Sequence, residues 1–219
     1  MKVTNKIILT IFMIVSLSLN GVLLYKKYNT QKTNSESSMK PFVKNRQSIY
    51  TTLTITRLDT VFIGDSQTQY FELSEFFKTK HVKNRGIRGD TTQGVLDRLS
   101  SITAYHPKVI FLNIGINDFM NEHKSADQAF NNYKLIFETI KRDSPETKIV
   151  TSSIFPCSVV DAEKIKSYNK KIKSLTSDHI DLFSEFENGG KLRAEYDSGD
   201  GVHLSGAGYV KWVSLINEL

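Results

Sequence analysis

The sequence predicts an α/β domain in which a parallel sheet of five strands carries helices on both faces. Three observations lead to this prediction. Short runs rich in Val, Ile and Phe alternate with longer amphipathic segments, this alternation continues from Leu58 to the C-terminus, and 219 residues suffice for one folded domain with a modest extension. Strands that alternate with helices join through right-handed crossovers into a parallel sheet.

Five short runs have the composition of strands, because β-branched and aromatic residues are enriched in them. The expected strands are residues 61–64, 81–84, 108–114, 148–154 and 179–183. Apolar residues recur at helical spacing elsewhere, and the expected helices are residues 67–77, 91–102, 126–142, 162–175 and 207–218. The helix at 126–142 has the most complete pattern, since Ser125 and Gln128 match a capping box.

An apolar run at residues 7–25 precedes the domain. It holds 19 residues without a charge and has lysines on both sides, and as a helix it would span about 28 Å, which matches the hydrocarbon core of a bilayer. We expect residues 1–25 to be an uncleaved signal anchor, a single transmembrane helix that leaves the domain outside the cell membrane. Two alternatives stay open: a signal peptide cleaved after Ser16 or Ser18, and a buried helix.

Residues 26–45 are rich in Lys, Asn, Ser and Thr, which is typical of a flexible linker, so the folded domain is expected at residues 46–219. The net charge of +6 comes from the N-terminal part: residues 1–57 contain nine Lys and Arg against one Glu, and residues 58–219 contain 20 Lys and Arg against 22 Asp and Glu. A slightly acidic domain lacks the basic surface that nucleic acids require, so we expect no nucleic-acid partner. The single cysteine, Cys157, excludes an internal disulfide framework and a Cys-rich zinc site.

Chemistry is expected at the loops after the first three strands, because open parallel sheets bind ligands beyond the carboxyl ends of their strands. The first loop holds Ser66, which follows Gly64 and Asp65 and begins the next helix. A serine there exposes a hydroxyl close to helix amides that favour negative charge. The alternative is a helix N-cap formed by Ser66 or Asp65. The elbow G-x-S-x-G of α/β-hydrolases does not fit, because Thr68 occupies the position of its last glycine.

The second and third loops contain candidate oxyanion donors. Gly89 in the second loop can present its N–H to an oxyanion, since glycine lets the backbone approach a ligand closely, and a tight turn capped by Asp90 is the alternative. Arg85 and Arg88 in this loop are weaker candidates for binding an anionic substrate group, with solvated side chains as the alternative. Asn117 in the third loop can donate from its side-chain amide to the same oxyanion, or it forms an Asx turn.

A fourth segment near the C-terminus pairs Asp200 with His203. A carboxylate three residues before a histidine can hold the tautomer and orientation that a general base requires. Ser205 lies two residues after His203 and is expected to cap the last helix. The remaining histidines have no such neighbour and are expected to be structural or solvated: His81, His106, His123 and His179.

The order Ser, Gly, Asn and Asp-x-x-His resembles the SGNH hydrolase superfamily, also called GDSL esterases and lipases. The matching blocks are GDSQT, NRGIRGDTT, GIND and DGVH, within residues 46–219. The resemblance implies a flavodoxin-like fold of three layers, α/β/α, with sheet order 2-1-3-4-5. Small bacterial lysophospholipase and acetylhydrolase-like members are the most similar, and Arg88 departs from them because they usually have a small residue there.

This resemblance also implies a serine esterase that cleaves a small-molecule or polysaccharide ester, such as an O-acetyl ester or a lysophospholipid, through an acyl-enzyme at the cell surface. Ser66 would be the nucleophile, His203 the base and Asp200 the residue that orients it, while Gly89, Asn117 and the Ser66 backbone N–H would form the oxyanion hole. No metal or organic cofactor is needed. Two other classes stay open: a membrane-tethered O-acyltransferase of cell-surface polysaccharide that uses the same three side chains, and a non-catalytic binding or scaffold protein.

Overall fold

The computed structural model describes residues 20–21 and 41–218. The compact unit Arg46–Leu219 contains the sheet. Helix α2 (Pro41–Thr52) begins inside the segment that the sequence predicts as a linker.

The predicted anchor at residues 7–25 lies outside the described residues except for Asn20 and Gly21. Within the part of the chain that the structure does describe, no helix has the length and apolar character needed to cross a bilayer. The transmembrane helix therefore stays a prediction from the sequence.

Five parallel strands form the sheet in the order β2-β1-β3-β4-β5, which confirms the predicted order. The strands are β1 (Thr60–Gly64), β2 (Val82–Gly86), β3 (Val109–Asn113), β4 (Lys148–Ser152) and β5 (His179–Ile180). In the register of the sheet, Gly64 at the end of β1 pairs with Gly86 on one side and with Asn113 on the other. The first three strands therefore end at one level, and the loops that follow them emerge together.

Helices cover both faces of this sheet, and their bounds differ in places from those the sequence predicts. They are α3 (Ser66–Gln69), α4 (Leu73–Phe77), α5 (Thr92–Arg98), α6 (Ser100–Thr103), α7 (Ile116–Met120), α8 (Ala126–Asp143), α9 (Ala162–Lys173), α10 (Leu182–Phe186) and α11 (Gly206–Asn217). A two-stranded hairpin, β6 (Glu187–Asn188) with β7 (Lys191–Leu192), follows α10.

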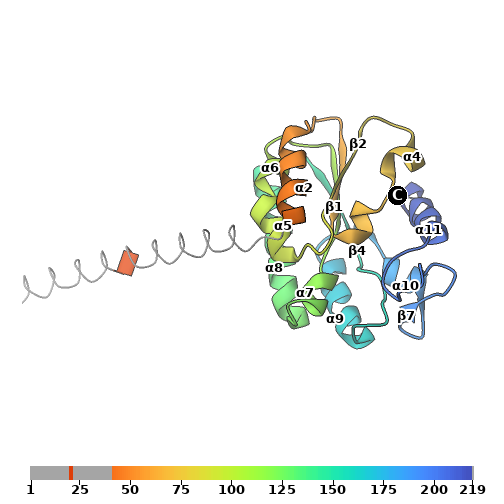
Figure 1. Ribbon diagram of the computed structural model, residues 1–219. Coiled ribbons are helices and arrows are strands. Elements are labelled where there is room, and N and C mark those ends of the chain that lie inside the picture. Colours follow the sequence, from red (N-terminus) through yellow and green to blue (C-terminus); the bar gives the residue numbers. More distant parts are fainter. Residues whose placement is uncertain (1–19, 22–40, 219) are drawn as a thin grey trace, which may run out of the picture. The chain divides into compact units, whose positions relative to one another are not determined.

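The alternation of side chains along β1 builds two cores. Val61 and Ile63 belong to a core with apolar residues of α5, α6, α8 and α9, whereas Phe62 belongs to a second core with residues of α4, α10 and α11. Figure 1 shows α5, α6 and α8 on one side of the sheet and α4, α10 and α11 on the other. In the second core, Phe62 stacks on Phe111 of β3 at 4.5 Å between ring centroids. The domain therefore has the predicted three layers, α/β/α.

The predicted helix at residues 67–77 is instead the two helices α3 and α4. Phe71 between them turns into the second core and stacks on Trp212 at 4.8 Å. The Asn84 amide donates to the carbonyls of Thr68 and Phe71, at 2.6 and 3.1 Å, so these carbonyls have partners outside a helix. Core packing and one strand side chain thus interrupt a segment whose periodicity favours a continuous helix.

The predicted strand at residues 179–183 is also wrong in its second half. The strand β5 ends at Ile180, and Asp181 begins α10 as its N-cap by accepting the backbone N–H of Ser184 at 3.3 Å. The caps predicted for α8 and α11 are confirmed: Ser125 and Gln128 form the capping box of α8, and Ser205 caps α11.

Candidate active site

Ser66 lies at the first position of α3, directly after the end of β1. Asp65 is the N-cap of this short helix, because its Oδ1 accepts the backbone N–H of Gln67 at 3.0 Å. Burial raises the pKa of the Asp65 carboxyl to about 7, and the charges of Asp90 and Asp118 act in the same direction. Since Asp65 takes the capping role, the Ser66 hydroxyl is available for another partner.

That partner comes from the loop before α11. An antiparallel bridge between Asp197 and Leu204 closes this loop, and Ser198 N–H donates to the His203 carbonyl at 2.9 Å. Gly201 inside the loop has φ +71, a left-handed conformation that favours glycine, and an added Cβ would lie 2.7 Å from Ser158 Oγ. The loop is thus held in a shape that presents His203 toward the end of β1.

Ser66, His203 and Asp200 form a hydrogen-bonded chain. Ser66 Oγ lies 2.9 Å from His203 Nε2, and His203 Nδ1 lies 2.6 Å from Asp200 Oδ2. The other oxygen of Asp200 accepts the backbone N–H groups of Val202 and His203 at 2.9 and 2.8 Å. The hydrogen bond from the His203 side chain, with those from the backbone, lowers the pKa of Asp200 well below its usual range. Asp200 therefore stays ionised and can hold a proton on His203 Nδ1.

The structure also brings the predicted oxyanion residues Gly89 and Asn117 to neighbouring places. Gly89 has φ +75, and Asp90 next to it accepts a hydrogen bond on its carbonyl from Asn117 Nδ2 at 2.9 Å. Asn121 Nδ2 donates to Asn117 Oδ1 at 3.1 Å, which fixes which end of the Asn117 amide faces Asp90. An amide nitrogen carries two hydrogens, so Asn117 retains a second donor.

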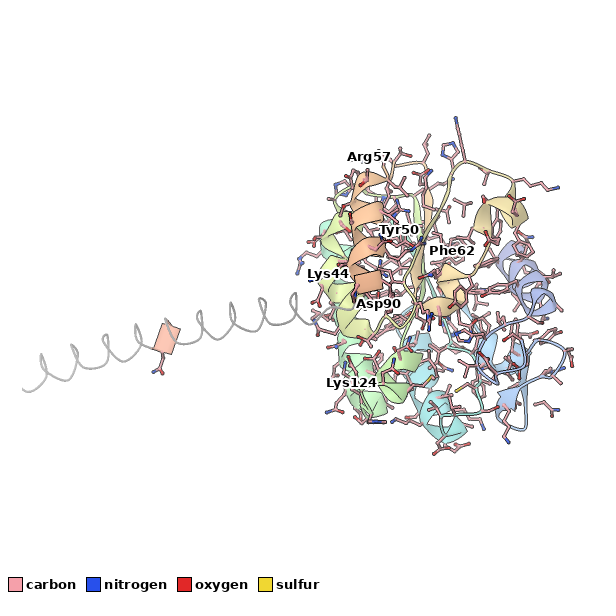
Figure 2. The ribbon with its side chains drawn as sticks, viewed as in Figure 1. Lys44, Tyr50, Arg57, Phe62, Asp90 and Lys124 are labelled. Atoms are coloured by element: carbon pink, nitrogen blue, oxygen red, sulfur yellow. The ribbon has the colours of Figure 1, made fainter. Side chains whose placement is uncertain are left out.

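A buried ion pair braces the Gly89 loop. Asp90 Oδ2 lies 2.9 Å from Arg98 Nε, with side chains that are 5 % and 6 % exposed, and Thr91 rather than Asp90 is the N-cap of α5. Removing one partner of such a pair costs about 3–5 kcal/mol, because it leaves a buried charge uncompensated. In Figure 2, Asp90 and Lys124 lie in the half of the domain away from Arg57, which precedes β1.

The two arginines proposed from the sequence have different surroundings. Arg85 is buried against α2: it donates to the carbonyls of Asn84 and Leu53, at 2.9 and 3.0 Å, and stacks over the Tyr50 ring. Arg88 is exposed, and its backbone N–H donates to Gln69 Oε1 at 2.7 Å. The structure therefore gives Arg85 a structural environment and leaves Arg88 at the surface beside Gly89.

The chain matches a family model over residues 62–211, and the family is described as GDSL-like lipase/acylhydrolase. The chain belongs to this family. Human platelet-activating factor acetylhydrolase IB subunit alpha2 is 28% identical over 179 residues, which cover 74% of this chain and 75% of the relative.

Two solved structures resemble this family member at similar identity. A GDSL-like lipase from Bacteroides thetaiotaomicron VPI-5482 has a TM-score of 0.72 and 25% identity, and the match covers 80% of this chain and 95% of that one. A candidate platelet activating factor from Streptococcus pneumonia has a TM-score of 0.73 and 28% identity, over 87% and 98% of the two chains. Family and relatives agree with the geometry, and the chain is an ester hydrolase of the acylhydrolase class.

Three features of this GDSL-type site were not predicted from the sequence. The Gln67 side chain is buried and contacts the His203 loop. The Tyr70 ring lies 5.6 Å from the His203 ring between centroids. Asp118 is buried and accepts from Thr92 N–H and Oγ1 at 2.8 and 2.6 Å. Such contacts join residues far apart in the sequence, so no local pattern signals them.

A cavity of about 540 Å³ lies beside β2, and Tyr70 is among its lining residues, whereas Ser66 and His203 are not. Its lining is mainly polar, with Arg46, Gln69, Tyr70, Glu72, Ser74 and Asn84 among the lining residues. Among the described residues, no three His, Cys, Asp or Glu side chains cluster as metal ligands would. The chemistry available here comes from the hydroxyl, the imidazole, the carboxylate and the backbone and amide donors.

Proposed function

We propose that this chain cleaves carboxylic esters through a covalent acyl-enzyme on Ser66. The observation that carries the proposal is the continuous hydrogen-bonded chain from Ser66 Oγ to His203 Nε2 and from His203 Nδ1 to Asp200. This is the order of contacts that lets an imidazole take a proton from a hydroxyl while a carboxylate stabilises the resulting imidazolium.

The first half of the reaction transfers the acyl group to the enzyme. Ser66 Oγ attacks the ester carbonyl carbon as His203 Nε2 takes the hydroxyl proton, and the carbonyl oxygen becomes an oxyanion. His203 then returns the proton to the alcohol oxygen, so the bond between carbon and that oxygen breaks and the alcohol leaves. In the second half, water attacks the acyl carbon as His203 Nε2 takes one of its protons. The bond between the acyl carbon and Ser66 Oγ then breaks, His203 gives the proton to Ser66 Oγ, and the carboxylic acid leaves.

We assign the oxyanion to three donors: the Ser66 backbone N–H, the Gly89 backbone N–H and the second hydrogen of Asn117 Nδ2. The Ser66 N–H belongs to the first turn of α3, where helix N–H groups have no partner inside the helix. The contact between Asn117 and Asp90 holds the Asn117 amide next to the Gly89 loop before any substrate binds. Donors held in advance at the developing charge lower the barrier without having to reorganise.

We propose an acetyl or other short acyl group on a polar alcohol as the substrate class. The polar lining of the cavity at Tyr70 suits a hydroxyl-bearing or charged alcohol better than a long alkyl chain. The name of the human relative, an acetylhydrolase, supports the same acyl size. The test is the kcat/KM of the purified protein on p-nitrophenyl acetate, butyrate, octanoate and palmitate. We expect kcat/KM to fall as the chain lengthens, and a maximum at octanoate or palmitate would contradict the short-acyl proposal.

Product analysis in the presence of a sugar acceptor shows whether the acyl group is transferred to water or to the sugar. We expect the free acid to be the main product, because water completes the reaction described above. Acyl sugar as the main product would instead make the protein an O-acyltransferase that uses the same three side chains.

We also propose that the predicted anchor at residues 7–25 attaches the hydrolase to the cell membrane, with the catalytic domain outside. The support is the uncharged apolar run between lysines. The full chain should sediment with membranes, and a variant without residues 1–30 should stay in the supernatant with its esterase activity. A mature protein that begins near Leu19 and is found in the medium would identify a cleaved signal peptide instead.

A further inference from the structure

Gln67, the residue after the proposed nucleophile, connects the two halves of the active site. Its side chain is 4 % exposed and crosses to the loop before α11. Gln67 Nε2 donates to the Val202 carbonyl at 2.6 Å, and Gln67 Oε1 accepts the Leu204 N–H at 3.3 Å. These two partners are the residues on either side of His203. One amide therefore holds the backbone that carries the proposed base.

The backbone of Gln67 is itself fixed. Its N–H donates to Asp65 Oδ1 at 3.0 Å, and its carbonyl accepts the Tyr209 hydroxyl at 2.9 Å. The amide thus extends from a rigid turn that also carries Ser66. The Gln67 amide donates one of the two hydrogen bonds to the loop and accepts the other. The contact therefore requires a side chain of the length of glutamine that carries both a donor and an acceptor.

The Asp200 and His203 pair lies within the loop and does not involve Gln67. The separation between His203 Nε2 and Ser66 Oγ is different, because it depends on where the whole loop sits relative to α3. We infer that Gln67 is a positioning residue that sets this separation and so keeps the base within reach of the nucleophile. The inference rests on the proposed function of Ser66 and His203 and goes beyond it, since it names the group that aligns them.

The first test is Gln67→Met, which keeps the length of the side chain and removes both hydrogen bonds. We expect kcat to fall about 10- to 100-fold, because a displacement of about 1 Å in a catalytic group costs a factor of that order. The KM for p-nitrophenyl acetate should stay the same, since Gln67 is buried beneath the loop. Gln128→Met is the matched control: it removes the glutamine of the capping box of α8 and should lower the Tm without changing kcat.

The second test is Gln67→Glu, which keeps the shape and the acceptor for the Leu204 N–H but places an oxygen against the Val202 carbonyl. Its kcat should fall at least as far as that of Gln67→Met, and lost packing cannot explain the result. Because a protonated glutamate can still donate to the Val202 carbonyl, the decisive result is that of Gln67→Met: the kcat of the wild type in that variant would overturn the inference, since methionine donates no hydrogen bond.

Proton NMR separates positioning from general loss of structure. The proton between His203 Nδ1 and Asp200 Oδ2 is expected to give a low-field resonance, and this resonance should persist in Gln67→Met because the pair lies inside the loop. Loss of the resonance together with kcat would show that the loop has unfolded, and a raised KM at constant kcat would show a role in substrate binding. Either result overturns positioning.

The failure of the inference can be distinguished from failure of the proposed function. If Ser66→Ala keeps its activity, the serine mechanism is wrong whatever the Gln67 variants do. If Ser66→Ala is inactive while Gln67→Met and Gln67→Glu keep the kcat of the wild type, the serine mechanism stands and only the role of Gln67 is wrong.

Discussion

The group of Ser66, His203 and Asp200 and the group of Ser153, His179 and Asp181 contain the same three side-chain types in different hydrogen-bonding orders. In the first group, His203 stands between the hydroxyl and the carboxylate. In the second group the hydroxyl stands in the middle: Ser153 Oγ lies 3.3 Å from His179 Nε2 and donates to Asp181 Oδ1 at 3.2 Å. The second arrangement holds the hydroxyl proton on the carboxylate side instead of preparing its transfer to the imidazole.

The two histidines also differ in their second ring nitrogen. His203 Nδ1 contacts the ionised carboxylate of Asp200, whereas His179 Nδ1 lies 2.9 Å from the Thr151 hydroxyl. Burial lowers the pKa of His179 to about 4 despite the nearby charge of Asp181. Ser153, directly after β4, is 1 % exposed, whereas Ser66 is 7 % exposed. Composition alone does not make a catalytic triad, since the order of the contacts and access to substrate decide it.

The largest expected effect separates the two serines. Ser66→Ala removes the nucleophile, so kcat on p-nitrophenyl acetate should fall by about 10⁴-fold or more, while the fold stays intact because a small side chain becomes slightly smaller. Ser153→Ala should keep the kcat of the wild type. The measurement is steady-state kinetics, with circular dichroism as the check on folding. A folded and active Ser66→Ala protein would contradict the serine mechanism.

The next effect separates the two aspartates. Asp200→Asn keeps the shape of the side chain but allows the wrong tautomer of His203, so kcat should fall by about 10²- to 10⁴-fold. Asp181→Asn should leave kcat unchanged, because Asp181 contacts Ser153 and the N-terminus of α10. Kinetics of both variants on the same ester test the comparison. Equal losses in the two variants would mean that the order of contacts is not what distinguishes the groups.

A smaller loss of kcat is expected when a donor of the oxyanion hole is removed. We propose such a hole for the group of Ser66 and none for the group of Ser153. Asn117→Ala removes one donor aimed at the developing charge, so kcat should fall by about 10²- to 10³-fold, or about 2.7–4 kcal/mol, with KM little changed. The control is Asn131→Ala, since Asn131 is an exposed residue of α8. A rise in KM without a fall in kcat would assign Asn117 to substrate binding.

The smallest effect concerns the pH dependence of stability at His179. The pKa of His179 is about 4 in the folded protein, below the ordinary 6.5. Between these values the unfolded chain binds a proton that the folded protein does not, so the free energy of unfolding falls as the pH falls. Asp65 acts in the opposite sense, because its pKa in the folded protein is raised to about 7. Its contribution to the free energy of unfolding is therefore lost as the pH rises from 3.8 to 7. A variant isolates the His179 contribution from this opposing one.

His179→Gln removes the titrating ring and can retain hydrogen bonds to the neighbouring hydroxyls. Urea denaturation of both proteins at several pH values between 7 and 4 gives the difference in their free energies of unfolding. This difference should shrink as the pH falls, since only the wild type has a ring that resists protonation. A difference that stays constant with pH would show that His179 does not titrate in that range.

Much of this domain could be predicted from local sequence signals. The alternation of short apolar runs with amphipathic segments indicates a parallel sheet. Strands and helices have different periodicities, so each segment can be assigned from its own residues. Ser125 and Gln128 predict the start of α8, which depends only on residues three apart. In the same way, Asp200 and His203 lie on one turn, so the contact between them follows from their spacing.

A topological rule brings the loops of Ser66, Gly89 and Asn117 together. They follow β1, β2 and β3, which end at one level of the parallel sheet, so the sequence points to one rim without any knowledge of distances. The rule does not place His203, which follows β7 outside this sheet. The linker boundary, the break between α3 and α4 and the helix α10 do not follow from such signals. There, packing of Phe71 on Trp212 and capping by Asp181 override the local periodicity.

The sequence by itself determined the fold class, the family and the residues of the proposed triad, because each is encoded by residue type and short spacing. Only the tertiary structure decided that Arg85 is buried against Tyr50, that Ser153, His179 and Asp181 have another order of contacts, and that Gln67 reaches Val202 and Leu204. The physical reason is distance along the chain: side-chain contacts across 26 to 137 residues depend on how the layers pack, and no local pattern specifies them.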